Sequence, residues 1–324
     1  MKSLHLLLPL PVRLEQALDS ARKASPSLMA ITRRGATLDA EQSLAGCCCR
    51  GFGIAKQQDW PIAPLTARSD GLEPGNAFWL RLDPAHLEVG MGGLMLRPAW
   101  ELSLSREEAR SLVASINDHW RAQGLEIHAP SPTRWYLSLP DTPDFTSTPL
   151  DQVVGEYLTP HLPRGRDANR LMTLVNEAQM LMHEHPVNQE RESAGRLTLN
   201  GLWLWGGGAL PTTATTATTL ERVASDDAEV RAMARAAGLQ PVPSPASLRD
   251  LGDPTRISNA LASLAPGQED FGLEDYLAKL ERDWFKPLLR ELAFGHIRRL
   301  RLDLLTRPSL SLSIGTAQAW RFWR

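Results

Sequence analysis

The chain has 324 residues, of which 43% are hydrophobic and 22% are charged, a composition typical of a folded protein with one large domain or two smaller ones. Its formal net charge of -2 at pH 7 offers no broad positive surface for nucleic acid. No stretch approaches the roughly 20 consecutive apolar residues of a membrane-spanning helix. Prolines interrupt the leucine-rich start and no small-residue cleavage site follows, so we expect a buried strand there and no signal peptide.

The three cysteines are adjacent, at Cys47, Cys48 and Cys49. Adjacent cysteines rarely meet the geometry of a disulfide, and the run lacks the C-x-x-C spacing of a zinc site. We therefore expect buried, reduced thiols. That usage suits a reducing compartment, and we expect a cytoplasmic protein.

The first half of the chain alternates apolar runs with amphipathic stretches. The run at 4–8 predicts a central strand of a largely parallel sheet. Ser105 followed by acidic residues predicts the start of a helix, and Gly124 predicts its end. The elements expected in this half are strands at 4–8, 78–89, 94–96, 125–128 and 134–139, with helices at 14–23, from 26, and at 105–121.

The second half continues the alternation after a Pro- and Thr-rich loop at 141–149. The expected elements are helices at 167–184, 228–237 and 273–292, strands at 202–205 and 300–305, and a Thr/Ala-rich linker at 211–219. Strands alternating with helices around a hairpin-containing middle predict an α/β protein, a mostly parallel sheet flanked by helices with an inserted α+β subdomain.

Three segments, in this order, carry a resemblance to a known family. The first is GNAFWLRLD at 75–83, and the second is LSREEARSLVASIN at 104–117 with RWYL at 134–137. The third and most specific is HPVNQERESAG at 185–195 with the strand end LWLWGGG at 202–208. Together they resemble the archaeal-type cofactor-independent phosphoglycerate mutases of the alkaline-phosphatase superfamily, well over 70–210 and weakly elsewhere. The chain also resembles a degenerate bacterial branch labelled regulatory protein or predicted phosphoglycerate mutase.

The resemblance implies a division of the chain. It predicts a reduced alkaline-phosphatase-like core at 1–100 and 197–324, and an inserted α+β subdomain of the substrate-binding type at 101–196.

The metal-ligand motifs of the family are not matched. Such mutases move a phosphoryl group through a phosphoserine held between two divalent metals. Where the family has an Asp-Gly pair after the first strand, this chain has LPLP at 8–11. The family's Ala-Pro-Asp segment corresponds to APGQED at 265–270, and its Asp-His-Ser-Thr-Pro motif corresponds to DLLTRP at 303–308. Leucine and glycine cannot replace carboxylate or imidazole ligands. The resemblance therefore implies no metal, no other cofactor and no catalytic residue here.

An anion-binding function is predicted for the arginine-containing segments. The planar guanidinium fork suits phosphate and carboxylate groups. The candidate residues are Arg81, Arg134, Asn188, Arg191, Gly206, Gly207 and Gly208. Structural alternatives stay open: Arg191 could pair with a glutamate on a helix, and a glycine triplet is common in turns. His183 and His185 are expected at a helix end rather than at a metal, and Trp203 and Trp205 in the core.

Three functions remain as hypotheses. The first is a catalytically degenerate, regulatory phosphoglycerate-mutase-like protein that binds an anionic metabolite or a protein partner. The second is an active mutase or phosphatase with two divalent metals, Mn or Zn, held by residues such as Asp70, Asp83, Asp270, His296 and Asp303. The third is a nucleic-acid-associated regulator that uses the basic residues at 296–301 and 320–324. We favour the first, which needs no nucleic acid and no membrane.

Overall fold

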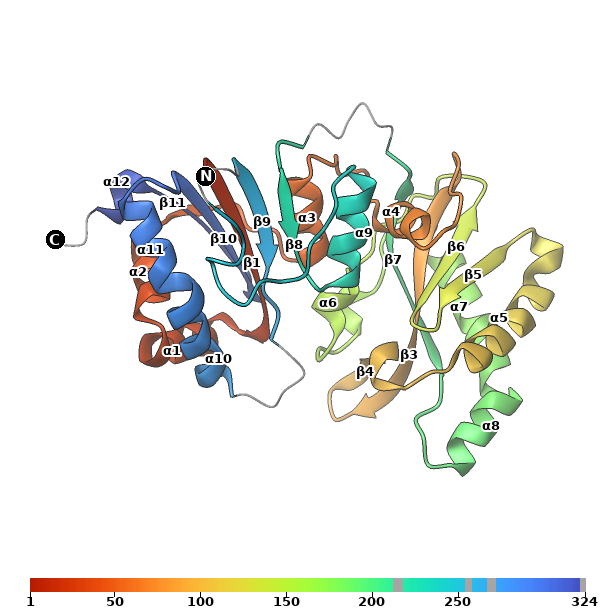
Figure 1. Cartoon of the computed structure of the whole chain (residues 1–324). Helices are drawn as coiled ribbons and strands as arrows, with labels where there is room; N and C mark the ends of the chain where they lie inside the picture. The colour runs from red at the N-terminus through yellow and green to blue at the C-terminus, as the bar shows by residue number, and fades with distance from the viewer. Residues whose placement is uncertain (212–217, 254–257, 267–271, 321–324) are drawn as a thin grey trace. The chain divides into compact units, whose positions relative to one another are not determined.

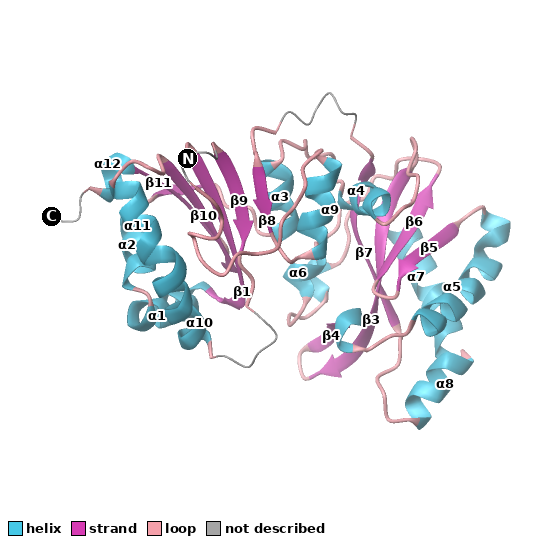
Figure 2. Ribbon diagram, in the orientation of Figure 1, coloured by secondary structure: helices cyan, strands magenta, loops and turns pink. Residues whose placement is uncertain are grey.

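The computed structural model describes residues 1–211, 218–253, 258–266 and 272–320 (Figure 1). The chain divides into two compact units, one formed by residues 1–54 and 214–324 and the other by residues 55–213. Both units are mixed α/β, as the colouring by secondary structure shows (Figure 2). Among the described residues, no helix is long and apolar enough to cross a membrane.

The first unit is built on a six-stranded sheet in the order β2-β11-β10-β1-β9-β8. Strands β10, β1, β9 and β8 run parallel, and β11 runs antiparallel to both of its neighbours. The strands are β1 (Ser3–Arg13), β2 (Ala36–Leu38), β8 (Arg222–Ala224), β9 (Asn259–Ser263), β10 (Arg299–Arg307) and β11 (Leu310–Gly315). The predicted central parallel strand is therefore confirmed.

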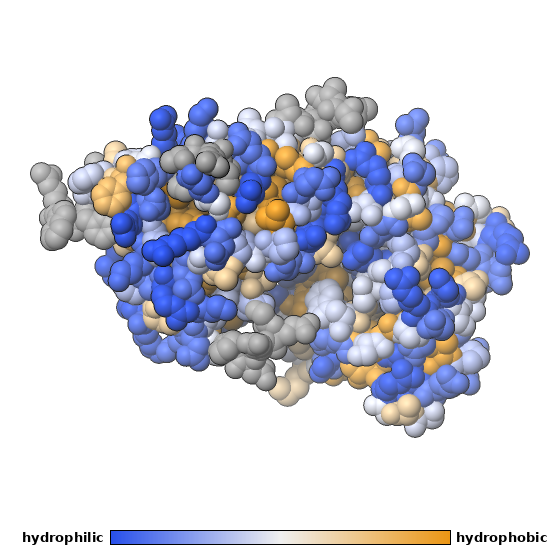
Figure 3. All heavy atoms as spheres, viewed as in Figure 1, coloured by the Kyte–Doolittle hydropathy of each residue, from blue (hydrophilic) through white to orange (hydrophobic). Residues whose placement is uncertain are grey.

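The helices of the first unit cover both faces of this sheet. They are α1 (Leu14–Ala24), α2 (Pro26–Arg34), α3 (Leu44–Gly51), α9 (Ala228–Ala236), α10 (Leu273–Leu280), α11 (Lys286–Ala293) and α12 (Thr316–Ala319). A π-helical turn, Glu281–Phe285, joins α10 to α11. Alternate leucines of β1 (Leu4, Leu6 and Leu8) point into a core shared with α10 and α11, since successive side chains of a strand point to opposite faces. Hydrophilic side chains cover most of the outer face of these helices (Figure 3).

The second unit holds a five-stranded sheet in which β4, β3, β6 and β5 follow one another and β7 pairs with β3. Its strands are β3 (Phe78–Gly90), β4 (Gly93–Pro98), β5 (Glu126–Ser131), β6 (Arg134–Leu139) and β7 (Gly201–Ala209). Its helices are α4 (Ile62–Ser69), α5 (Arg106–Trp120), α6 (Leu150–Val153), α7 (Ala168–His183) and α8 (Pro186–Ser193). All five strands pair antiparallel.

The two faces of the second sheet differ in character. One face carries Phe78, Leu80 and Leu82 and packs against the apolar sides of α5 and α7. The other face carries Trp79 and Tyr136 and packs against alanines of α4. Because side chains alternate along a strand, the polar residues at positions 81 and 83 of β3 fall on the α4 face.

The fold class predicted from the sequence is confirmed: a mostly parallel sheet with flanking helices is combined with an antiparallel α+β unit. Strands β3 and β7 pair with each other in the second sheet, within the unit formed by residues 55–213, and the predicted division at 1–100 with 197–324 and 101–196 stays a prediction. Helices α3, α4 and α8 were not expected. Most of the predicted linker at 211–219 and the residues at 321–324 lie outside the described residues.

Candidate anion-binding site

Strand register brings Arg81 beside two aromatic side chains. Arg81 on β3 is directly opposite Tyr136 on β6 and Trp205 on β7. Directly opposite residues of antiparallel strands point to the same face, so the three side chains meet on the α4 side of the sheet. The guanidinium carbon of Arg81 lies 5.0 Å from the ring centroid of Trp205 and 5.5 Å from that of Tyr136. A desolvated guanidinium is stabilised over aromatic faces in this way.

Asp83 neutralises Arg81 inside the protein. Nε and Nη2 of Arg81 donate to the two carboxylate oxygens of Asp83 at 2.9 and 2.8 Å, and the indole Nε1 of Trp205 donates to the same carboxylate at 2.8 Å. Both charged side chains are 2% exposed. A buried charge needs a paired partner, and this bidentate pair supplies it. Arg81 is thus part of the interior under the site, not its surface.

Arg134 forms the more accessible part of the cluster. Its Nε and Nη2 donate to Asp70 at 2.9 and 2.7 Å, and the hydroxyl of Tyr136 donates to Asp70 at 2.7 Å. Burial alone would raise the pKa of Asp70, but the hydrogen bonds from Arg134 and Tyr136 hold that pKa below its ordinary value. The side chain of Arg134 is 25% exposed. Its Nη1 has no hydrogen-bond partner among the described residues and is available to an external acceptor.

The cluster connects Arg81 and Arg134 through Tyr136. One face of the Tyr136 ring meets the guanidinium of Arg81, and its hydroxyl meets the Asp70 that holds Arg134. Trp79 lies edge-on to Tyr136, with ring centroids 6.4 Å apart, and is stacked at a tilt on His128. Asp70, Asp83 and Tyr136 had no place in the predicted anion site. The two-residue spacing of Asp83 from Arg81 and the strand position of Tyr136 two residues after Arg134 are the signals that would have found those two residues; no such signal points to Asp70.

Asn188 and Arg191 lie elsewhere, on α8, which packs against α5 beyond the opposite face of the sheet. Asn188 is buried, donates to the carbonyls of Met182 and Leu199, and accepts from the Leu199 amide. Arg191 is fully buried, and its guanidinium binds Glu108 at 3.0 Å and two backbone carbonyls. The structure does not bring these two residues together with Arg81 and Arg134. Their polar groups bind backbone groups and, for Arg191, the Glu108 carboxylate of the protein itself.

The glycine triplet at 206–208 lies where β7 meets the loop before α4. Gly206 has a φ of +67°, and its amide donates to the Ser147 hydroxyl, which is bonded in turn to buried Asp59. A Cβ on Gly208 would lie 2.6 Å from Cβ of Pro61. The side-chain amide of Gln57 bonds both backbone groups of Ala209. The absence of side chains here allows the 57–61 loop to approach β7 closely, and an anion contact stays a prediction.

The residues suggested for a relocated metal site are held by other partners. Asp70 and Asp83 pair with Arg134 and Arg81 as described, and His296 bonds Glu291 at 2.7 Å. Asp303, buried on β10, accepts hydrogen bonds from His5, Arg301 and Ser311. Asp270 lies outside the described residues. His185 begins α8, where its Nδ1 accepts the Val187 amide, and His183 ends α7, as expected of helix-terminal residues.

Comparison with known proteins identifies the relatives of the chain. No family model matches it. It is 28% identical over 151 residues to the probable 2,3-bisphosphoglycerate-independent phosphoglycerate mutase of Geobacter sulfurreducens. This match covers 46% of this chain and 38% of the relative. It is 43% identical over 68 residues to the corresponding mutase of Methanothrix thermoacetophila, 21% of this chain and 17% of the relative. Parts of the chain are thus similar in sequence to 2,3-bisphosphoglycerate-independent phosphoglycerate mutases. The matches span less than two fifths of the length of these relatives.

One solved structure carries the same fold over nearly the whole chain. The PH0037 protein of Pyrococcus horikoshii aligns with 99% of this chain and 92% of its own, with a TM-score of 0.53 and 15% sequence identity. The cofactor-independent phosphoglycerate mutase of Thermoplasma acidophilum aligns with 97% of this chain and 90% of its own at a TM-score of 0.47 and 14% identity. The first of these likenesses shows a common fold with this chain.

The prediction that no metal cofactor is involved is wrong in the light of these relatives. They are mutases of the cofactor-independent class, for which two divalent metals supply the means of phosphoryl transfer. In the part of the chain that the structure describes, however, no group of three or more His, Cys, Asp and Glu side chains is placed to hold a metal ion.

Proposed function

We propose that this chain is a cytoplasmic, regulatory phosphoglycerate-mutase-like protein that binds a small phosphorylated or carboxylate metabolite and does not itself turn it over. The main support for the proposal is Arg134, whose partly exposed side chain pairs with Asp70 through Nε and Nη2 and leaves Nη1 for an external acceptor. The relationship to phosphoglycerate mutases supports a phosphorylated acid as the ligand. The reduced, buried cysteines support the location.

The electrostatics of the cluster define what kind of binding to expect. Two arginines are balanced by two aspartates, Arg81 by Asp83 and Arg134 by Asp70. Recognition would therefore rest on directional hydrogen bonds from Arg134 rather than on excess positive charge. Such binding falls only modestly with added salt, unlike binding that depends on many released counterions.

The loss of turnover is supported at the motif that resembles the family's last metal-binding segment. Asp303 stands at the aspartate, but Leu304 follows it where the family has histidine. The carboxylate of Asp303 is already used by His5, Arg301 and Ser311, and the residue is fully buried. A carboxylate committed to three donors is poorly disposed to bind a metal.

The test is calorimetric titration of the purified protein with 3-phosphoglycerate, comparing Arg134→Gln with Arg110→Gln. Arg110 is an exposed arginine of α5 without an ion pair among the described residues, so its substitution controls for the change in charge. We expect Arg134→Gln to weaken binding about tenfold, the usual effect of removing a charged hydrogen bond. Equal affinity in the two variants would contradict the site.

A metal analysis and a mutase assay with Mn²⁺ or Zn²⁺ distinguish this proposal from the alternative, an active mutase or phosphatase. About two metals per chain together with turnover would identify an active mutase or phosphatase and overturn the regulatory proposal. If no phosphorylated acid binds, a protein partner becomes the proposed ligand of the regulatory function.

A further inference from the structure

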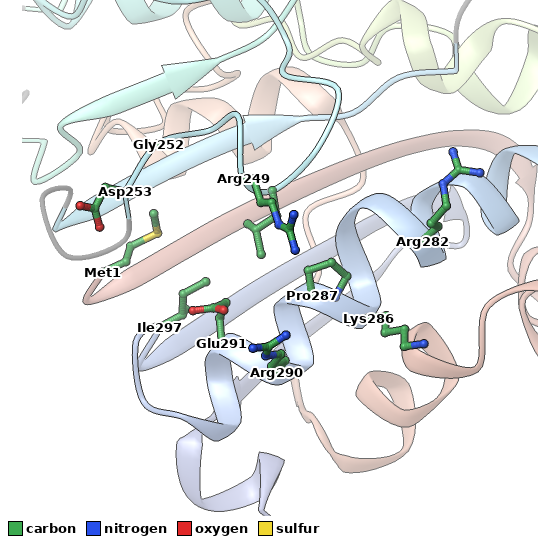
Figure 4. Close-up of a pocket in the computed structure, with 11 residues that line it drawn as sticks. Met1, Arg249, Gly252, Asp253, Arg282, Lys286, Pro287, Arg290, Glu291 and Ile297 are labelled. Carbon is green, nitrogen blue, oxygen red and sulfur yellow. The ribbon is translucent and has the colours of Figure 1, made fainter.

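A pocket in the first unit combines an apolar base with a basic rim (Figure 4). Its volume is about 660 Å³, within the range of small-molecule sites. Leu248 and Ile297, which are both buried, line the pocket together with Pro287 of α11. In the close-up, Arg249 lies on one side of the pocket and the residues of α11 lie across from it.

Three cations follow one another along the helical side of the pocket. Arg282, Lys286 and Arg290 are spaced by four residues, which places them on one face of a continuous helical segment. Arg282 is paired with Asp283, but Lys286, Arg290 and Arg249 form no ion pair with any described residue. Like charges at this spacing repel each other, so an anion in the pocket would relieve the repulsion.

The two carboxylates that line the pocket are Glu291 and Asp253. Glu291 accepts a hydrogen bond from His296 at 2.7 Å. Asp253 lies beside Met1 at the end of the pocket away from Arg282 and Lys286 (Figure 4). With Arg282 paired to Asp283, the lining keeps three further cations, Arg249, Lys286 and Arg290, against two carboxylates.

The walls of the pocket are fixed by hydrogen bonds. The π-helical turn at 281–285 lies next to α11, and π turns recur at functional sites. The amide of Leu248 donates to the carbonyl of Asp283 within this turn at 3.0 Å. Arg222 donates to the carbonyl of Leu251 at 2.8 Å. The segment that carries Leu248 and Arg249 is therefore held at both ends against the rest of the unit, which makes the pocket preformed.

We propose that this pocket binds a small molecule with an apolar body and an anionic head group, a carboxylate or a phosphate monoester. The apolar body would cover Leu248, Pro287 and Ile297, and the head group would lie among Lys286, Arg290 and Arg249. Burial of the apolar body supplies the affinity, and the cations select for the negative charge. The site belongs to the first unit and is separate from the Arg134 cluster, which belongs to the second.

The experiment is calorimetric titration with decanoate and with decyl phosphate, each below its micelle concentration. We expect one molecule per chain of at least one of them, and the tighter ligand identifies the preferred head group. Acetate lacks the apolar body and octyl glucoside lacks the charge, so each should bind at least about tenfold more weakly. Absence of binding by both decyl ligands would overturn the proposal, and so would equal binding of acetate or of octyl glucoside.

Variants locate the site. The double substitution Lys286→Glu with Arg290→Glu should weaken binding at least about tenfold, whereas Arg110→Glu on the second unit should leave it unchanged. If charge reversal alters the unfolding temperature, Lys286→Ala with Arg290→Ala repeats the test without introducing new carboxylates. Unchanged affinity in the pocket variants, or equal weakening by Arg110→Glu, would place the ligand elsewhere and overturn the proposal.

Discussion

His5 and Asp303 are joined side chain to side chain across the neighbouring parallel strands β1 and β10, in the interior of the first sheet. Asp303 is fully buried and also accepts from Arg301 of its own strand and from Ser311 of β11. One carboxylate thus connects the side chains of three adjacent strands. A cluster of this kind is costly to break, because the remaining donors are left buried without an acceptor.

Asp303→Asn should lower the free energy of unfolding by about 3 kcal/mol, since the neutral amide accepts through one oxygen only and leaves the half-buried Arg301 without its carboxylate partner. Urea denaturation measures this difference. The matched control is Asp19→Asn, which removes the acceptor of an exposed pair with Arg22. That exposed pair should contribute less than about 1 kcal/mol. Equal urea midpoints for the two variants would show that the Asp303 cluster is not stabilising.

The same cluster predicts how stability depends on pH. Burial alone would raise the pKa of Asp303, but hydrogen bonds from His5, Arg301 and Ser311 hold it well below its ordinary value of 3.8. The unfolded chain therefore binds a proton more readily than the folded chain does. The stabilisation is complete above the unfolded pKa and is lost as the pH falls below about 4. Urea titrations from about pH 7 to pH 3 should show the difference between wild type and Asp303→Asn shrinking at the acidic end; a constant difference would contradict the assignment.

Local signals in the sequence predicted much of the fold. Ser105 and Glu108 form the capping box that begins α5, and Gly124 takes the left-handed conformation that follows it. These features depend on residues close together in the chain, for which propensity and spacing are informative. The apolar run at 4–8 likewise predicted the central strand β1.

The partners of the arginines were less predictable. Arg134 meets Asp70 from 64 residues away, a contact that no local pattern specifies. Arg191 binds a glutamate 83 residues earlier in the sequence, so the structural alternative was right in kind while its partner could not be found by helical spacing. The pocket on α11 depends on a π turn and on a loop held by backbone hydrogen bonds, and side-chain periodicity does not encode either.

Arg191 should be needed for stability. Its guanidinium is fully buried and binds Glu108 together with the carbonyls of Leu197 and Leu102. Arg191→Ala should lower the free energy of unfolding by about 3 kcal/mol, because it leaves buried acceptors unsatisfied and a cavity behind.

Arg196→Ala is the matched control for Arg191. Arg196 pairs with the same Glu108 but is 45% exposed, so its loss should cost less than about 1 kcal/mol. Chemical denaturation of both variants checks the difference. Similar destabilisation by the two substitutions would show that the contacts of Arg191 with buried backbone carbonyls do not contribute to stability.

Gly208 should not accept a side chain. A Cβ there would lie 2.6 Å from Cβ and 3.0 Å from Cα of Pro61, and the backbone of Pro61 cannot move without displacing the loop before α4. Gly208→Ala should therefore lower the free energy of unfolding by about 1–3 kcal/mol. Gly315→Ala is the comparison, because its nearest contact would be an ordinary 3.5 Å to the Arg298 carbonyl. The two variants having the same melting temperature would mean that the loop does not rest on β7 as closely as described.

The cysteine run should be unreactive in the folded protein. Cys47, Cys48 and Cys49 lie on α3 and are fully buried, and burial raises the pKa of all three thiols. Because the thiolate is the reactive species, both access and ionisation oppose attack. Ellman's reagent should therefore release no colour from the native protein within minutes, and should titrate all three thiols in urea. Ala122→Cys, at an exposed turn, supplies a positive control that reacts at once. Fast reaction of the wild-type protein, which lacks the Ala122→Cys substitution, would show that α3 readily unfolds from the sheet. Only local unfolding could expose these buried cysteine side chains to the reagent.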